Sequence, residues 1–500
     1  MLKSSLLFLA IGILFLLVAD IEITTLDPMT EMGRMGWGAL TPDFSSLYQI
    51  RFDLLNTVVF AFCGIALGIA AGSVLAFFFQ RRPVRLACAF VRAIHEIFWA
   101  FLLIPIVGLN SVCGVLAIAI PYAGIFAKVY AEILEEADQR PLHALPPGTN
   151  PVVKFCYGVV PVIFGHLSHY TSYRFECALR SSAVLGFIGL PTLGYHLETA
   201  FREGYYSEAS ALLYIFFVLI ASLKYWVKPK WAMAYVLLAF VMLAKEVRFS
   251  FENVARFFHE ILPWPMRRQG VLDGSGDLSL PWADIWDWFA QVIRLEAAPG
   301  IWNTIVLTQI VLAATGVFAV LAIPALCRHL SGGLIRRPSS YLFIVLRTTP
   351  EYIMAYIFLQ AWGPSMLPAV AAIALHNGAI LSHLIGNHAS LLQLRIDITK
   401  KRINRYAYEI LPRIYGSFLA FLFYRWEVMM RESAILGILG IYTLGFYIDS
   451  AISDDKLDKA VLLILFTALL NMGIDHISQK VRRALKVSTK LVSNAVTSPL

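Results

Sequence analysis

Two stretches of the chain place one acid, two bases and a tyrosine at the same spacing near the end of an apolar run. The pattern is Tyr-Arg-x-Glu-x-x-x-Arg, and its residues are Tyr173, Arg174, Glu176 and Arg180, and again Tyr424, Arg425, Glu427 and Arg431. The glutamate lies four residues before the second arginine, which suits an ion pair on one helix face, and the tyrosine shares that face. A charge at the centre of a bilayer costs about 2.5–3.5 kcal/mol unless it is paired or faces a cavity. The pattern therefore predicts either a self-neutralised pair that fixes helix packing or the lining of a translocation path.

The two stretches belong to a longer repeat. Residues 173–194 and 424–445 align without a gap at an offset of 251 (424 − 173), and 12 of these 22 positions are identical. Because the offset is close to half of the 500 residues, the repeat predicts two copies of one structural unit. We expect these units at 1–228 and 229–500.

The composition excludes a soluble multidomain enzyme. Apolar residues make up 58% of the chain and charged residues only 15%, with a mean hydropathy of +0.69, whereas soluble domains are about 25% charged. The net charge of +8 is interpreted as basic cytoplasmic loops rather than a nucleic-acid surface. None of the six cysteines has CxxC spacing, so the sequence predicts neither a disulfide framework nor a thiolate metal site.

Hydropathy predicts an all-α polytopic membrane protein with about 12 spans, six in each unit. The first, 1–19, is expected to be a retained span, since no small-x-small cleavage site follows it. The others are 55–79, 98–107, 112–129, one from 155 into the first repeat, 209–223, 231–244, 302–325, 341–360, 366–385, one running into the second repeat, and 460–474.

The distribution of Lys and Arg predicts the orientation. With both termini inside, the basic loops at 81–85, 224–230, 328–337 and 480–490 all fall on the cytoplasmic side. Six spans is an even number, so the two units are expected to be parallel repeats related by an axis along the membrane normal.

The segment 245–300 is predicted to lie outside the membrane. Its stretch 251–262 resembles an amphipathic helix on a membrane surface. Trp264, Trp282, Trp286 and Trp288 suit the aromatic belt at the interface, and the alternative is a docking surface for an external partner.

Both units resemble the permease subunits of ATP-binding-cassette (ABC) importers, specifically the phosphonate-transport permease family. The resemblance rests on Arg92-Ala93-Ile94-His95-Glu96, Tyr157-Gly158-Val159-Val160-Pro161, and Tyr173-Arg174-Phe175-Glu176 with Arg180-Ser181 and Val184-Leu185-Gly186. In the second unit, Arg347 and Glu351 match Arg92 and Glu96 at an offset of 255. The resemblance implies the type I importer permease fold, a separate cytoplasmic ATPase dimer and an external solute-binding protein. ATP and magnesium are expected in the ATPase, because this chain has no GxxxxGK[ST] motif.

The resemblance places an ATPase-docking loop between spans four and five of each unit, at 132–155 and 386–405. The expected docking residues are Glu135, Glu136, Gly148 and Pro161 in the first unit, and Arg395, Lys401, Arg402 and Pro412 in the second. The second loop is four residues shorter, has lost the family's glycine and is basic, so the two units are expected to contact their ATPases differently. A basic loop could also hold anionic lipid.

The resemblance implies transport of a small phosphorus oxyanion, phosphonate-like, across the bacterial inner membrane by alternating access. The expected path residues are Arg92, Glu96, Tyr173, Arg174, Glu176, Arg180, Arg347, Glu351, Tyr424, Arg425, Glu427 and Arg431. Phosphite, phosphate or a solute without phosphorus remain alternatives.

Two other classes of protein stay open. An ion-coupled secondary transporter would use intramembrane acids and histidines such as Glu96 and His95. A membrane enzyme or redox subunit could use His166 and His169, but the second copy has Ser417 and Ala420 there, so we predict no metal site and no catalytic residue.

Overall fold

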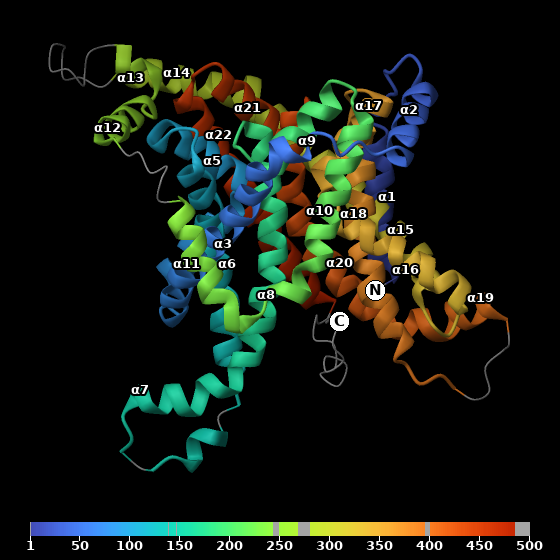
Figure 1. Ribbon diagram of the computed structural model, residues 1–500. Coiled ribbons are helices and arrows are strands. Elements are labelled where there is room, and N and C mark those ends of the chain that lie inside the picture. Colours follow the sequence, from blue (N-terminus) through green and yellow to red (C-terminus); the bar gives the residue numbers. More distant parts are fainter. Residues whose placement is uncertain are drawn as a thin grey trace. The chain divides into compact units, whose positions relative to one another are not determined.

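The computed structural model describes residues 2–138, 140–146, 148–243, 250–268, 281–395 and 401–485. Within these ranges every regular element is a helix, which confirms the all-α class (Figure 1). Parts of both expected docking loops (139, 147 and 396–400), parts of the expected external segment (245–249 and 269–280) and the basic tail from Lys486 lie outside the described residues.

The chain forms two compact units, which we call unit N (34–261) and unit C (1–33 with 262–500). This division differs from the expected boundary at 228 because the first apolar helix of each half packs against the other half. In unit C, α1 (Leu2–Leu16) contacts α15 (Ala298–Leu326), and the Phe8 ring lies 4.8 Å from that of Phe423. In unit N, α11 (Pro229–Leu243) contacts α3 (Leu47–Phe77).

The remaining helices of unit N are α4 (Arg82–Ala93), α5 (Glu96–Val107), α6 (Ser111–Glu135), α7 (Pro151–Lys154), α8 (Val160–Val184), α9 (Leu193–Arg202), α10 (Tyr206–Trp226) and α12 (Phe251–Glu260). Those of unit C are α13 (Trp264–Arg268), α14 (Trp282–Val292), α16 (Gly333–Thr348), α17 (Glu351–Trp362), α18 (Met366–Ser390), α19 (Arg402–Arg405), α20 (Leu411–Ile435), α21 (Leu444–Ser453) and α22 (Leu457–Ala484). Helix α2 (Pro28–Leu40) crosses the boundary between the units.

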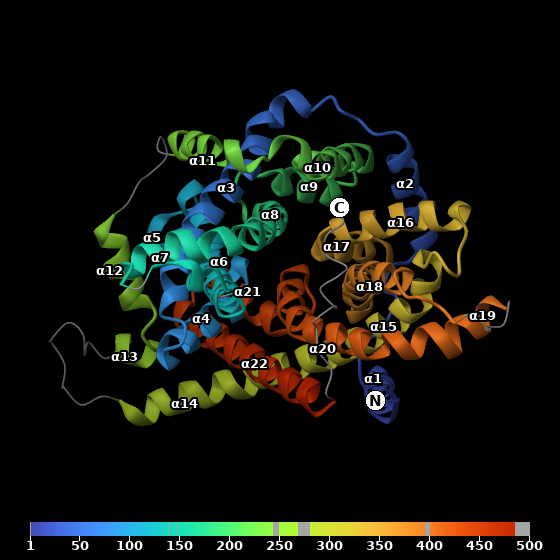
Figure 2. The ribbon, with the colours of Figure 1, turned by 90° about the horizontal axis from the view of Figure 1, so that it is seen from below.

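Each unit is built around one central apolar helix. In unit N, α6 contacts α3, α4, α5 and α8; in unit C, α18 contacts α15, α16, α17 and α20, as Figure 2 shows around the label α18. Both central helices have 25 residues, and 72% of the apolar window of each is buried within the protein. A polar side chain on these helices is therefore held away from solvent and lipid.

Seven of the described helices are long and apolar enough to cross a membrane, or up to ten if each bent pair of helices counts as one span. Two shorter apolar helices occur at 5–16 and 229–243. The expected single span 341–360 is interrupted, since α16 and α17 meet at an angle of 95°. Pro350 lacks an N–H and disfavours helical geometry at Thr349, whose ψ is 123°. In unit N, α4 and α5 meet at 93°.

The glycine-rich end of each repeated block makes a tight turn. Gly189 and Gly440 adopt φ of +89° and +84° after a short 3₁₀ turn, a conformation that strongly favours glycine. Just before them the chain approaches itself closely. A Cβ on Gly437 would lie 2.0 Å from the backbone nitrogen of Phe446, and one on Gly186 would lie 2.2 Å from that of Tyr195.

We expect Gly437→Ala to destabilise unit C by roughly 1–3 kcal/mol, because the added methyl group has to displace backbone. The measurement is the thermal unfolding midpoint of the detergent-purified chain. Gly473→Ala is the control, since nothing lies within 4 Å of its added Cβ, and its midpoint should change little. Equal midpoints for both variants would contradict the close approach.

Candidate functional site

Unit N buries a glutamate where its helix breaks. Glu96 begins α5 and is 4% exposed, so its carboxylate lies at a helix N-terminus, which favours negative charge. His95 caps the same helix: its Nδ1 accepts from the N–H of Ile97 at 3.3 Å. The Nε2 of neutral His95 must then carry the hydrogen, and it lies 3.0 Å from Glu96 Oε2. Ser181 on α8 donates to Glu96 Oε1 at 3.3 Å.

Unit C holds the matching glutamate, whose side chain is 13% exposed, in a different way. Glu351 begins α17 directly after Pro350, and its histidine comes from α18. The Nδ1 of His376 lies 2.9 Å from the carbonyl oxygen of Thr349, so Nδ1 must donate. The Nε2 of His376 then faces the carboxylate, 3.7 Å from Glu351 Oε2.

The histidine and the proline have exchanged places between the two units. At the offset of 255, His95 corresponds to Pro350 and Pro121 corresponds to His376. Each unit therefore has one histidine beside its glutamate, on the break itself in unit N and on the central helix in unit C.

The carbonyl groups at the end of the preceding helix are also satisfied by different side chains. In unit N, Trp99 Nε1 donates to the carbonyl of Val91 at 3.1 Å. In unit C, Met354 occupies the position of Trp99, and the carbonyl of Leu346 instead meets His376 Nδ1 at 3.3 Å. Since the last carbonyls of a helix have no partner within it, both arrangements stabilise the break.

A hydrogen-bonded network surrounds the site in unit C. Asn377 is fully buried; it donates to Glu432 Oε2 at 2.9 Å and accepts from Arg425 Nε at 2.6 Å. The guanidinium of Arg425 also lies 3.5 Å from Glu432 Oε1. At the repeat offsets, unit N has Tyr122 in place of Asn377 and Ser181 in place of Glu432. Unit C thus carries one carboxylate more than unit N at these matched positions.

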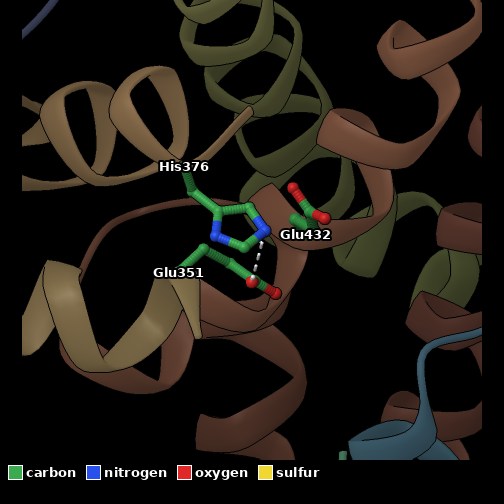
Figure 3. Close-up of side chains that lie close together, drawn as sticks. All are labelled: Glu351, His376 and Glu432. Atoms are coloured by element: carbon green, nitrogen blue, oxygen red, sulfur yellow. Dashed lines mark ion pairs between the residues drawn. The ribbon is translucent and has the colours of Figure 1, made fainter. Parts of the chain in front are cut away.

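Three helices bring Glu351, His376 and Glu432 together. Figure 3 shows their side chains converging from α17, α18 and α20, and one donor atom of each lies within 4.8 Å of the others. The sequence prediction included Glu351 as a path residue but missed the other two. Both could have been found by looking for positions where the second repeat has a more polar residue than the first. His376 corresponds to Pro121, and Glu432 corresponds to Ser181.

The other expected path residues lie on the helices beside the breaks. Arg92 and Arg347 are in the last turns of α4 and α16, and Arg347 Nη1 lies 3.5 Å from His383 Nδ1. Arg174 donates to the Tyr170 hydroxyl at 2.7 Å and lies over the Tyr173 ring. Arg180 donates to Cys177 Sγ at 3.3 Å, while the remaining residues Glu176, Tyr424, Glu427 and Arg431 lie on α8 and α20. The pairs Glu176–Arg180 and Glu427–Arg431 stay predictions.

The expected docking residues surround the short helices α7 and α19. Glu135 ends α6, Gly148 has a φ of +87°, and Pro161 and Pro412 are the second residues of α8 and α20. Glu136, Arg395, Lys401 and Arg402 are exposed. In the first loop, hydrogen bonds from Arg140 lower the pKa of Asp138 and hold its carboxylate charged.

Several known transport proteins are similar to this chain. It is 23% identical to the phosphate-import permease protein PhnE of Mycolicibacterium smegmatis over 497 residues, which covers 89% of this chain and 87% of that protein. It is 30% identical to the cryptic phosphonate transport system permease protein PhnE2 of Escherichia coli K12, covering 22% of this chain and 91% of the relative. The chain belongs to the phosphonate-transport permease family.

This permease is also 25% identical to the phosphite transport system permease protein PtxC of Stutzerimonas stutzeri, over 39% of this chain and 75% of that protein. No family model and no solved structure matches it. Together with the apolar helices, these relatives identify a multi-pass protein of the inner membrane.

We expect Asn377→Leu to destabilise the permease by about 1–3 kcal/mol, because it removes the bridge between the partly buried Arg425 and the buried Glu432. Thermal unfolding in detergent measures the effect. Asn387→Leu makes the same change at an exposed position of α18 and should shift stability by less than about 0.5 kcal/mol. A loss no larger for Asn377→Leu than for this control would show that the bridge contributes nothing.

Proposed function

We propose that the chain is the membrane-spanning permease subunit of an ABC importer that moves a small phosphorus oxyanion, phosphonate-like, into the cell by alternating access. The observation that carries this proposal is the similarity along nearly the whole chain to a permease named for phosphate import. Other relatives are named for phosphite and phosphonate transport, so the three oxyanions are the first candidate substrates.

The proposal includes two tandem copies of one permease fold. Helices α8, α9 and α10 begin at 160, 193 and 206, while α20, α21 and α22 begin at 411, 444 and 457, a constant offset of 251. The match to the phosphite permease uses 39% of this chain and 75% of that protein, as expected if that relative corresponds to one copy. With the two shorter apolar helices as first spans, each copy has six spans and both termini are cytoplasmic.

The elements expected to bind the ATPases resemble each other in the two units. In unit N, α7 lies at the end of α8 away from α9 (Figure 1). Val152 on α7 is 66% exposed, and Tyr157, in the helical turn Phe155–Val159 that follows α7, is 74% exposed. In unit C, Ile403 and Tyr408 occupy the corresponding positions and are each 81% exposed. Tyrosine is enriched among the residues that contribute most of the binding energy at protein interfaces. We propose that each pair inserts into one ATPase of a dimer.

The translocation path is proposed to use the charged residues near the helix breaks. Arg174 and Arg425 offer positive charge to an oxyanion, and the buried carboxylates prevent it from being held too tightly. Selectivity is proposed to reside in an external solute-binding protein, and ATP with magnesium is proposed to bind only in the partner ATPases.

One observation favours a second candidate, an ion-coupled secondary transporter. His376 and Glu432 are buried and Glu351 is partly buried, on one helix long enough to cross a membrane and two that belong to bent pairs of helices, and proton-relay groups of such transporters lie within the membrane. This candidate assigns no role to the exposed residues near α7 and α19, namely Val152 with Tyr157 and Ile403 with Tyr408.

The decisive experiment is the ATPase activity of the reconstituted complex of this chain with its ATPase. We expect the binding protein loaded with phosphonate, phosphite or phosphate to stimulate hydrolysis several-fold over the unloaded protein. The complex without binding protein gives the basal rate. If the ATPase does not bind the chain at all, the importer assignment fails; if it binds and no oxyanion stimulates it, the substrate class is wrong.

We expect Tyr157→Ala and Tyr408→Ala each to weaken ATPase binding at least tenfold, since buried tyrosines at interface centres contribute about 2 kcal/mol or more. Tyr205→Ala, which removes a similarly exposed tyrosine (59%) between α9 and α10, is the control and should bind as the wild type does. Affinity is measured with the labelled ATPase and the permease in nanodiscs. Unchanged binding in both Tyr157→Ala and Tyr408→Ala would show that the ATPase docks elsewhere.

A further inference from the structure

The site in unit C needs a cation that its counterpart in unit N does not need. A neutral imidazole has one donor and one acceptor nitrogen. In unit N, His95 Nδ1 accepts from a backbone N–H, so the hydrogen on Nε2 points toward Glu96. In unit C the roles are reversed. His376 Nδ1 donates to the carbonyl of Thr349, so a neutral His376 turns the lone pair of Nε2 toward the carboxylate of Glu351. A lone pair and a carboxylate repel each other unless a cation lies between them.

The distance between the two groups indicates which cation fits. A protonated histidine and a carboxylate in a charge-assisted hydrogen bond lie about 2.7–2.9 Å apart. His376 Nε2 and Glu351 Oε2 are 3.7 Å apart, which is too long for that bond. Two ligands of a tetrahedral zinc ion, each bonded at about 2.0–2.2 Å, are separated by about 3.4 Å. The spacing is thus closer to that of two ligands of one metal ion.

A third donor lies near this pair, and the surrounding groups orient it. Glu432 brings a carboxylate from α20 to within 4.8 Å of the other two donors. Asn377 and Arg425 hold that carboxylate, while the Thr349 carbonyl holds the imidazole with Nε2 pointing inward. Hydrogen bonds of this kind fix the ligands of known metal sites. One nitrogen and two carboxylate oxygens are ligands suited to Zn²⁺ and related divalent ions.

We propose that Glu351, His376 and Glu432 bind one divalent transition-metal ion of the zinc class. The ion joins α17, α18 and α20 at the break in unit C. Unit N lacks the third carboxylate, because Ser181 stands where unit C has Glu432. This site does not depend on the transport assignment.

The test is zinc binding to the full-length chain, purified in detergent and stripped with a chelator. Isothermal titration at neutral pH should show one tight Zn²⁺ per chain, and Co²⁺ should give visible d–d absorption at the same stoichiometry. His376→Ala and Glu432→Ser, which restores the residue of unit N, should each weaken binding at least tenfold. His196→Ala is the matched control: this histidine also meets a carboxylate, Asp53 at 2.6 Å, and its loss should leave the affinity unchanged.

Thermal unfolding provides a second readout that does not need a fully stable variant. Zn²⁺ should raise the unfolding midpoint of the wild type and of His196→Ala, but not that of Glu432→Ser, because a ligand stabilises only the state that binds it. No saturable zinc binding by the wild type would overturn the proposal and leave a proton as the cation of this site. Equal zinc affinity in His376→Ala, Glu432→Ser and the wild type would also overturn it.

Discussion

A carboxylate buried where a membrane helix breaks has to be compensated, and much of each unit is arranged around that requirement. Glu96 and Glu351 both begin a helix that turns by more than 90° from the preceding one. The helix N-terminus supplies partial positive charge, but an uncompensated buried charge would still cost several kcal/mol. The central helix, the helix after the docking loop and a histidine therefore converge on each glutamate. This requirement explains why polar residues interrupt otherwise apolar helices.

The two units meet the same requirement with different residues. Unit N uses His95 and Ser181, whereas unit C uses His376 and surrounds it with Asn377, Arg425 and Glu432. The exchange of histidine and proline keeps one histidine at each glutamate but reverses which nitrogen donates. At the matched positions, unit C carries Asn377 and Glu432 where unit N has Tyr122 and Ser181.

The sequence predicted the features that depend on local pattern. The apolar runs predicted the helical class, and the family resemblance pointed to Glu96 and Glu351. The exchange of α1 and α11 between the two halves was missed, because it depends on contacts between residues hundreds of positions apart, such as Phe8 with Phe423. The interruption at Pro350 was missed because the apolar stretches on either side of residues 347–351 were joined into one expected span. Glu432 was missed because the two repeats were compared for identical residues rather than for gained polar ones.

The most direct test of the central claim, that this chain is the permease of an ATP-driven oxyanion importer, is uptake of labelled phosphonate, phosphite and phosphate into proteoliposomes. The liposomes carry the complete complex, with the binding protein outside and ATP inside. The account predicts accumulation of at least one oxyanion that requires ATP, the ATPase and the binding protein. Accumulation by this chain alone, driven by an ion gradient without ATP, would contradict the account and identify a secondary transporter.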